Sequence, residues 1–284
     1  RGLGDVYKRQ PDMAGGPTFN FAQVRLQSRY GERADESVWL RLYNTLDLTS
    51  YLHTAQQTPL RTWLLGIDSN HTAHEVEQAL RQKYRQHVDE VAGWLPAEWR
   101  PSFYWIKQLS DLPVFQYLLD GGRAQQWMKA DPALSDFIAD DVAMRSQAMR
   151  RSGLDCLVKA WQQGDSMSAA WLDHWVKLWP HTEKFEAGMR CLARLLRVRL
   201  LKDQQPYLQG ADVGKSIIDE ESESVNGKLA VMFRRYAFQP AAAGAYLAII
   251  ASDLFHIRSD LMQRLLFQGS VSMNEEVSAE ARQV

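Results

Sequence analysis

The sequence predicts an all-α protein, and three observations support this fold class. Apolar residues recur at spacings of three and four over most of the chain between Phe19 and Phe267, which is the period of an α-helix. Alternating runs of β-branched residues are scarce, and the Asn226-Gly227 pair lies in a polar stretch instead of closing a hairpin. Capping residues, glycines and prolines separate the helical patterns. We therefore expect a multi-helix funnel or a bundle of repeated helical lobes.

The clearest helix start lies at Thr72. Thr72 and Glu75 have the spacing of a capping box, in which each side chain binds the backbone N–H of the other. Gly93 and Pro96 are expected to end this helix. Its apolar face consists of Val76, Leu80, Tyr84, Val88, Val91 and Leu95.

Two further strong patterns lie in the last third of the chain. One is formed by Phe185, Met189, Leu192, Leu196 and Leu200. The other is expected to begin at Pro240 and to end at Gly269, and it contains Tyr246, Ile250, Leu254, Ile257, Leu261 and Leu265. Shorter helical patterns cover approximately residues 19–30, 35–44, 46–56, 103–119, 133–150, 154–163 and 168–178.

Glycines and polar stretches mark the breaks between the helices. We expect breaks at 66–70, 121–122 and 164–166, and a mobile loop or short linker over the Asp-, Glu- and Ser-rich stretch 209–227. These breaks predict one helical domain over residues 13–269, with lobes at 13–121, 122–209 and 228–269. The polar residues 270–284 are expected to form a disordered tail.

The first ten residues, RGLGDVYKRQ, lie outside any apolar periodicity. They resemble the translated end of a sequencing adaptor, so we expect residues 1–12 to be non-native and to pack on nothing. The natural sequence would then resume near Pro11, with Met13 as its start. The alternative is a basic arm that binds acidic partners.

Composition limits the classes of function. The 284 residues carry 33 Lys and Arg against 34 Asp and Glu, so no basic field of the kind that attracts nucleic acid is expected. Cys156 and Cys191 form no CxxC pair, which favours a reduced cytoplasmic setting, and a single disulfide between them is the alternative. The most apolar segment, 241–250, is about half as long as a membrane span, so we expect no segment that crosses a membrane. No cofactor or metal is expected.

Two stretches superficially resemble catalytic motifs. Gly210 and Gly214, followed by Lys215 and Ser216, resemble a phosphate-binding loop, but three residues instead of four separate the glycines and no strand precedes them. Ser166, in the sequence Gly-Asp-Ser-Met-Ser, resembles a hydrolase nucleophile. An N-cap role for Asp165 or Ser166 at the following helix is the simpler interpretation.

The histidines do not form a zinc motif. His74 and Glu75 would need a histidine at the position of Gln78 to complete H-E-x-x-H, so His71 and His74 are interpreted as surface residues at a helix start. His87 follows a few turns later in the same helical pattern.

Arginines and tryptophans offer candidate contact residues. Arg190, Arg194 and Arg197 form a basic stripe on one helix face, which is a solvated face or a docking strip for an acidic partner. Among the ten tryptophans of the chain, four fall on roughly helical spacing and favour core positions or partner contacts: Trp161, Trp171, Trp175 and Trp179.

A family resemblance rests on several short segments in a fixed order. The N-terminal segments are Phe19–Arg29 (FNFAQVRLQSR), Trp39–Leu42 (WLRL), Leu46–Leu52 (LDLTSYL) with Thr58, Val76–Leu80 (VEQAL) and Leu109–Gly121 (LSDLPVFQYLLDG). The C-terminal segment is Pro240, Ala245–Leu247 (AYL) and the helix through Ile257 and Arg258 to Leu265. Together they resemble the C/d family of A-type/V-type rotary ATPase subunits, whose members are designated C in the A-type and d in the eukaryotic enzymes. The match covers most of 19–121 and 238–267, and Pro113 and Gln116 depart from the turn of that family.

The resemblance implies a non-catalytic helical funnel that is cytoplasmic and peripheral to the membrane. Its partners would be the rotor ring and the central-shaft subunits of a rotary ATPase, and it would touch the membrane only through the ring. We expect an apolar ring contact and a mixed shaft contact. The alternatives are a helical hydrolase that uses Ser166 and one of the seven histidines, or a helical scaffold for an unknown partner.

Overall fold

The computed structural model describes residues 18–202 and 214–280, and all regular secondary structure in these ranges is helical. The all-α prediction is confirmed, while the arrangement as repeated lobes stays a prediction. The α-helices up to residue 130 are α1 (Phe19–Gly31), α2 (Glu36–Tyr43), α3 (Leu48–Gln56), α4 (Arg61–Leu64), α5 (Ala73–Trp94), α6 (Arg100–Trp105), α7 (Leu112–Leu119) and α8 (Gln126–Ala130). The later ones are α9 (Val142–Arg151), α10 (Asp155–Gln163), α11 (Met167–Lys177), α12 (Glu183–Lys202), α13 (Gly214–Arg235) and α14 (Pro240–Glu280). Short 3₁₀ turns are η2 (Ala97–Trp99), η3 (Ile106–Asp111) and η4 (Ser135–Phe137).

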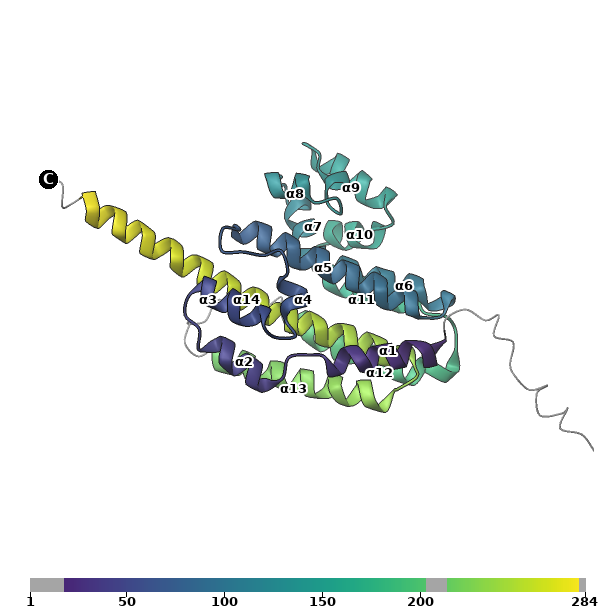
Figure 1. Cartoon of the computed structure of the whole chain (residues 1–284). Coiled ribbons are helices and arrows are strands. Elements are labelled where there is room, and N and C mark those ends of the chain that lie inside the picture. The colour runs from purple at the N-terminus through teal and green to yellow at the C-terminus, as the bar shows by residue number, and fades with distance from the viewer. Residues whose placement is uncertain (1–17, 203–213, 281–284) are drawn as a thin grey trace, which may run out of the picture.

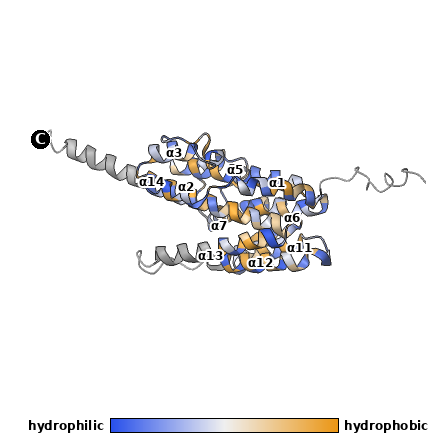
Figure 2. Cartoon of the chain, turned by 60° about the horizontal axis from the view of Figure 1, so that its bottom comes forward, coloured by the Kyte–Doolittle hydropathy of each residue, from blue (hydrophilic) through white to orange (hydrophobic). Residues whose placement is uncertain are grey.

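Helix α14 forms the axis of the molecule. It packs against α1, α3, α5, α12 and α13, and Figure 1 shows it running lengthwise through the body. The periodic residues that predicted this helix are buried, including Tyr246, Ile250, Ile257 and Leu261. Figure 2 shows hydrophilic and hydrophobic residues side by side on the described helices, as expected when each helix buries one face.

Small residues at the start of α14 allow α12 to approach closely. Residues 241–245 are buried, and all of them are alanine except Gly244. A Cβ atom on Gly244 would lie 2.5 Å from Cδ2 of Leu192 on α12. A larger residue at this position would force the Leu192 side chain to move, so glycine lets α12 and α14 pack closely here.

The predicted capping box of α5 is confirmed. The Thr72 N–H donates to Glu75 Oε2 at 2.7 Å, and the Glu75 N–H donates to Thr72 Oγ1 at 3.3 Å. Helices at the other strong patterns are also confirmed, because α12 spans 183–202 and α14 begins at Pro240. The shorter pattern at 103–119 becomes α6, η3 and α7, and the one at 133–150 becomes η4 and α9.

Two boundaries were predicted wrongly. The stretch 209–227 was expected to be a loop, but α13 begins at Gly214 and runs through Asn226 and Gly227. Helix α14 continues through Gly269 to Glu280, so it does not end at Gly269 as predicted, while the disordered tail at 270–284 stays a prediction. Neither segment contains proline, and a glycine inside a helix costs only about 1 kcal/mol relative to alanine. The predictions for residues 1–12, for 209–213 and for 281–284 lie outside the described residues.

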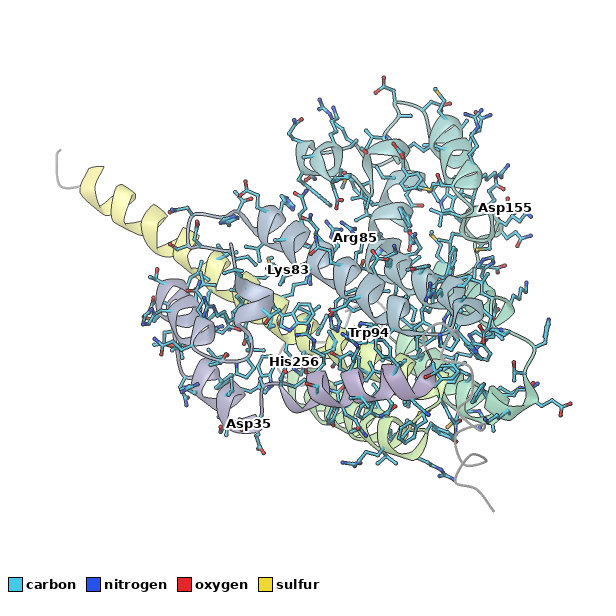
Figure 3. The ribbon with its side chains drawn as sticks, turned by 45° about the vertical axis from the view of Figure 1, so that its right-hand side comes forward. Asp35, Lys83, Arg85, Trp94, Asp155 and His256 are labelled. Atoms are coloured by element: carbon cyan, nitrogen blue, oxygen red, sulfur yellow. The ribbon has the colours of Figure 1, made fainter. Side chains whose placement is uncertain are left out.

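Helices α8, α9 and α10 form a group on one side of α5 (Figure 1). Arg85 of α5 joins them to the body by binding Asp111 at the end of η3 and Asp131 after α8, each at 2.9 Å. Figure 3 shows Arg85 on the face of α5 that is turned toward this group. Arg145 of α9 closes the group by donating to the carbonyl oxygens of Leu118, Gly122 and Ala139.

Candidate functional site

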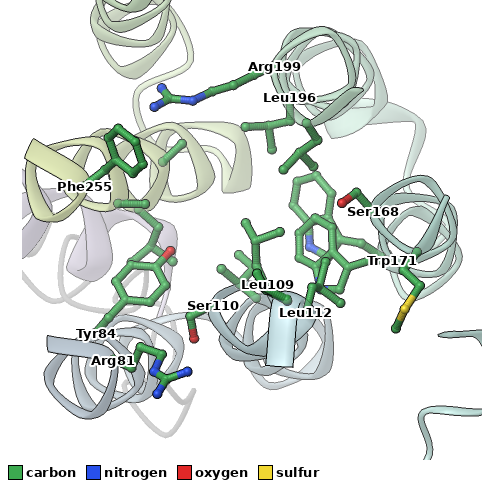
Figure 4. Close-up of a pocket in the computed structure, with 18 of the residues that line it drawn as sticks. Arg81, Tyr84, Leu109, Ser110, Leu112, Ser168, Trp171, Leu196, Arg199 and Phe255 are labelled. Carbon is green, nitrogen blue, oxygen red and sulfur yellow. The ribbon is translucent and has the colours of Figure 1, made fainter. Parts of the chain in front are cut away.

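A cavity of about 870 Å³ lies between the α14 axis and the helices that carry the middle of the chain. Its walls come from α5, η3, α7, α11, α12, α13 and α14, and Figure 4 shows many of the residues that line it. Much of the lining is aliphatic, including Leu80, Leu109, Leu112, Leu196 and Leu254. A cavity of this size and lining falls in the range of small-molecule pockets.

Both cationic and acidic residues line the cavity. Its cationic residues are Arg81, Arg199 and Arg258, and its acidic residues are Glu77 and Asp165. Arg258 binds Glu77 at 3.4 Å, and Arg199 donates to the Ser252 hydroxyl at 3.4 Å.

Arg81 stands out among these residues because it is buried and unpaired. Only 7% of the residue is exposed, and its Nε and Nη2 atoms have no hydrogen-bond partner among the described residues. The guanidinium lies over the ring of Trp127, 4.8 Å from the ring centre. Burial lowers the pKa of Arg81 relative to an ordinary arginine, although the acidic residues Glu77, Asp111 and Asp131 oppose this shift. Such a cation is costly unless an anion reaches it.

Two tryptophans of α11, Trp171 and Trp175, line the cavity. Trp105 and Trp171 exchange hydrogen bonds: the indole Nε1 of Trp105 donates to the Trp171 carbonyl at 3.1 Å, and the reverse bond is 3.3 Å. Trp171 and Trp175 are both 1% exposed, which confirms the predicted core role, while Trp161 and Trp179 pack partly buried against the core. The Nε1 of Trp175 has no partner among the described residues.

Ser166 lies on the wall of the cavity and caps α11. Its Oγ accepts a hydrogen bond from the Ala169 N–H at 3.1 Å, which confirms the predicted N-cap. No hydrogen bond that the structure describes joins Ser166 to a histidine.

The histidines of α5 and of the turn before it serve local contacts. Nδ1 of His71 lies 3.0 Å from Asp68, and His74 stacks on Trp127. His87 lies inward, with its Nε2 atom 2.9 Å from the Tyr246 hydroxyl. Within the described ranges, no group of three or more His, Cys, Asp and Glu side chains could hold a metal ion.

The predicted basic stripe lies on the exposed face of α12. Arg190, Arg194 and Arg197 are all exposed. Arg190 pairs with Glu186 on its own helix and Arg197 pairs with Asp173 of α11, so two of the three charges are already balanced within the chain. Of the stretch that resembles a phosphate-binding loop, Gly214, Lys215 and Ser216 form the start of α13, and Gly210 lies outside the described residues.

The segment Pro240–Leu265 of α14 is long and apolar enough, by length and composition, to cross a membrane. The apolar segment is longer than the predicted 241–250, because its few charged residues all lie in its second half. That no segment of the chain crosses a membrane stays a prediction. Of the most apolar window of Pro240–Leu265, 78% is buried inside the protein, as in the core helix of a globular bundle.

Comparisons of the chain with models of known protein families, with curated proteins and with solved structures found no match.

Proposed function

We propose that this chain is a non-catalytic adaptor subunit of an A-type/V-type rotary ATPase, cytoplasmic and peripheral to the membrane, that couples the rotor ring to the central shaft. The observation that carries the proposal is the packing of the segments that resemble the C/d family. These segments, 19–121 and 238–267, lie far apart in the sequence but meet around α14.

Polar contacts hold the two segments together along the length of α14. Arg33 binds Asp253 at 2.7 Å, and the Tyr51 hydroxyl donates to Asp260 at 3.3 Å. Arg264 donates to the Thr45 carbonyl at 2.7 Å and to the Leu42 carbonyl at 3.1 Å. An adaptor that transmits torque needs such rigid connections between its ends.

An exposed apolar patch gives this unit a surface for a partner. Leu40, Tyr43 and Leu46 follow one another at spacings of three, and they are 57%, 71% and 90% exposed. Exposed apolar clusters of this kind are typical of protein interfaces. We assign this patch to the apolar contact with the ring.

The test is co-purification of the tagged chain with the rotor-ring and central-shaft subunits encoded in the same genome. We expect both to be retained, and we expect replacement of Tyr43 and Leu46 by aspartate to release the ring. Met144, which is 61% exposed on α9, provides the control, because its replacement by aspartate should leave retention unchanged. Failure of the unaltered chain to retain either partner would overturn the proposal.

A further inference from the structure

We propose that the end of α13 and the turn that follows it form the contact surface for an acidic protein partner, with Phe238 as the apolar anchor. This surface, the α13 end, consists of Lys228, Val231, Arg234, Arg235 and Phe238. Within the adaptor role the partner is the central-shaft subunit, and that identification rests on the proposed function. The chemistry of the partner follows from the backbone, the exposure and the charges of the α13 end.

Phe238 is held in a backbone conformation that phenylalanine rarely adopts. Its φ of 65° lies in the left-handed region, and among the described residues every other positive φ belongs to a glycine. Gln23 of α1 fixes this conformation, because its side chain accepts a hydrogen bond from the Phe238 N–H at 3.0 Å. Gln23 is buried, whereas Phe238 is 51% exposed. Backbone strain of this kind is concentrated at functional sites, so we interpret Phe238 as an aromatic residue that is positioned for a contact.

The residues before Phe238 are basic, and their charges are not balanced within the described part of the chain. Lys228, Arg234 and Arg235 are exposed, and none of them forms an ion pair with a described residue. The stretch 225–239 contains no Asp or Glu. The basic stripe of α12 differs, because two of its three arginines are paired within the chain. Charge complementarity therefore favours a partner that brings carboxylates to the α13 end.

Apolar and basic groups share one face at the α13 end. Val231 is 52% exposed, and it lies three residues after Lys228 and three before Arg234. Residues three and four apart are neighbours on a helix surface. The opposite face of this part of α13 is buried in the core and contains Leu229, Met232 and Phe233. Because arginine and aromatic residues dominate binding hot spots, the α13 end fits a partner in which carboxylates border an apolar pocket for Phe238.

The α13 end and the apolar patch that we assign to the ring lie at opposite ends of the α14 axis. Phe238 comes two residues before the start of α14 at Pro240. The patch lies beside Arg264 of α14, which donates to the carbonyl oxygens of Leu42 and Thr45. From residue 240 to residue 264 an α-helix rises by about 36 Å. Figure 1 shows α2 and α3 at one end of the body and the turn between α13 and α14 at the other. Two partners can therefore bind at the same time, as coupling of the ring to the shaft requires.

The experiment measures the affinity of the full chain for the purified central-shaft subunit and, separately, for the rotor ring. Phe238→Asn should weaken shaft binding about 10- to 100-fold, because the anchor is lost. Ring binding should change less than about threefold, because the two surfaces are far apart. The double variant Arg234→Glu and Arg235→Glu should weaken shaft binding at least about 10-fold at low salt and make it less sensitive to salt. Phe255→Asn is the matched control: Phe255 of α14 is also 51% exposed but lies away from the α13 end, so shaft binding should stay within about threefold of the wild type.

The melting temperature separates loss of the contact from loss of the fold. Asparagine adopts the left-handed region more readily than phenylalanine, so Phe238→Asn should melt close to the wild-type temperature. The proposal is overturned if Phe238→Asn binds the shaft as tightly as the wild type, or if it loses binding together with a clear fall in melting temperature. Undiminished shaft binding by the double arginine variant would overturn it as well.

Two more outcomes have a distinct meaning. If the shaft does not bind while phosphatidylglycerol vesicles bind the wild type and not the double arginine variant, the α13 end is a lipid contact and the proposal is overturned. Shaft binding that none of the variants weakens overturns the role of the α13 end and leaves the proposed function standing. A wild type that binds neither the shaft nor the ring overturns the proposed function itself, and the role of the α13 end with it.

Discussion

Arg33, in the loop between α1 and α2, forms a bidentate ion pair with Asp253 of α14. Nε and Nη2 of Arg33 each lie 2.7 Å from a different oxygen of Asp253, although 220 residues separate the two in sequence. The Asp253 side chain is only 9% exposed and that of Arg33 is 21% exposed. The pair is therefore one of the polar contacts that fix the N-terminal helices on the α14 axis.

Replacement of Asp253 by alanine should lower the free energy of unfolding by about 3 kcal/mol. Removal of one partner from a buried pair leaves the other charge without compensation, and the partial exposure of Arg33 keeps the loss near the lower end of the usual range. Urea denaturation followed by circular dichroism measures the change. The control is Glu32→Ala, which breaks the exposed Arg29–Glu32 pair and should cost about 0.5 kcal/mol or less. Equal losses in the two variants would show that the Asp253 pair contributes no more than a surface contact.

The environment of His87 predicts a pH dependence of stability. Burial lowers the pKa of His87 below its ordinary value of 6.5, the positive charge of Arg29 lowers it further, and Glu90 opposes the shift. The unfolded chain therefore takes up a proton at a higher pH than the folded protein does, so stability is lost as the pH falls below about 6.5. His87→Gln keeps a neutral side chain that can bond the Tyr246 hydroxyl and should lose less stability on acidification.

The measurement is denaturation of the wild type and of His87→Gln at several values between about pH 7.5 and about pH 5. We expect the difference in unfolding free energy to shift in favour of the glutamine variant as the pH falls. His53→Gln, at an exposed histidine of α3, is the control for the same replacement at the protein surface. A constant difference for His87→Gln would contradict the prediction.

Local signals in the sequence were sufficient to predict most helices. The α5 helix is the clearest case, because Thr72, Glu75 and the apolar face from Val76 onward all lie within one element and predict it without knowledge of the fold. Long apolar periodicity likewise placed α12 and α14. The wrong boundaries lie at 214–227 and 269–280, where glycine and acidic residues suggested a break. Both segments lack proline, so nothing in them prevents a helix from continuing.

The cavity could not be predicted in the same way. In the sequence, Arg81 is a charged residue on an amphipathic helix, a position that normally faces solvent. Its burial depends on Trp127 from α8, and its lack of a partner depends on Arg85, which engages both Asp111 and Asp131. The residues that Arg85 binds are 26 and 46 positions away from it in the sequence, so these contacts exist only after the helices pack. The resemblance to the C/d family gave no indication of them either.

The cap of α11 gives a prediction that distinguishes a structural from a catalytic role of Ser166. Ser166→Ala should lower the free energy of unfolding by about 1 kcal/mol, because the Ala169 N–H loses its acceptor. Ser166→Asp keeps an acceptor at the N-cap and should retain nearly all of that stability, although it removes the hydroxyl. Thermal denaturation and hydrolysis of a model ester by all three proteins provide the readouts. Ester hydrolysis that disappears in both variants would favour the hydrolase alternative.

Trp171 and Trp175 allow the hydrogen bond of a buried indole to be separated from its packing. Both side chains are 1% exposed and one helical turn apart on α11. The Nε1 of Trp171 donates to the Trp105 carbonyl, whereas the Nε1 of Trp175 has no partner among the described residues. Trp171→Phe should therefore cost about 1 kcal/mol more than Trp175→Phe, because only the first removes a hydrogen bond made by a buried indole. Urea denaturation of the two variants checks this, and equal losses would mean that packing alone accounts for both.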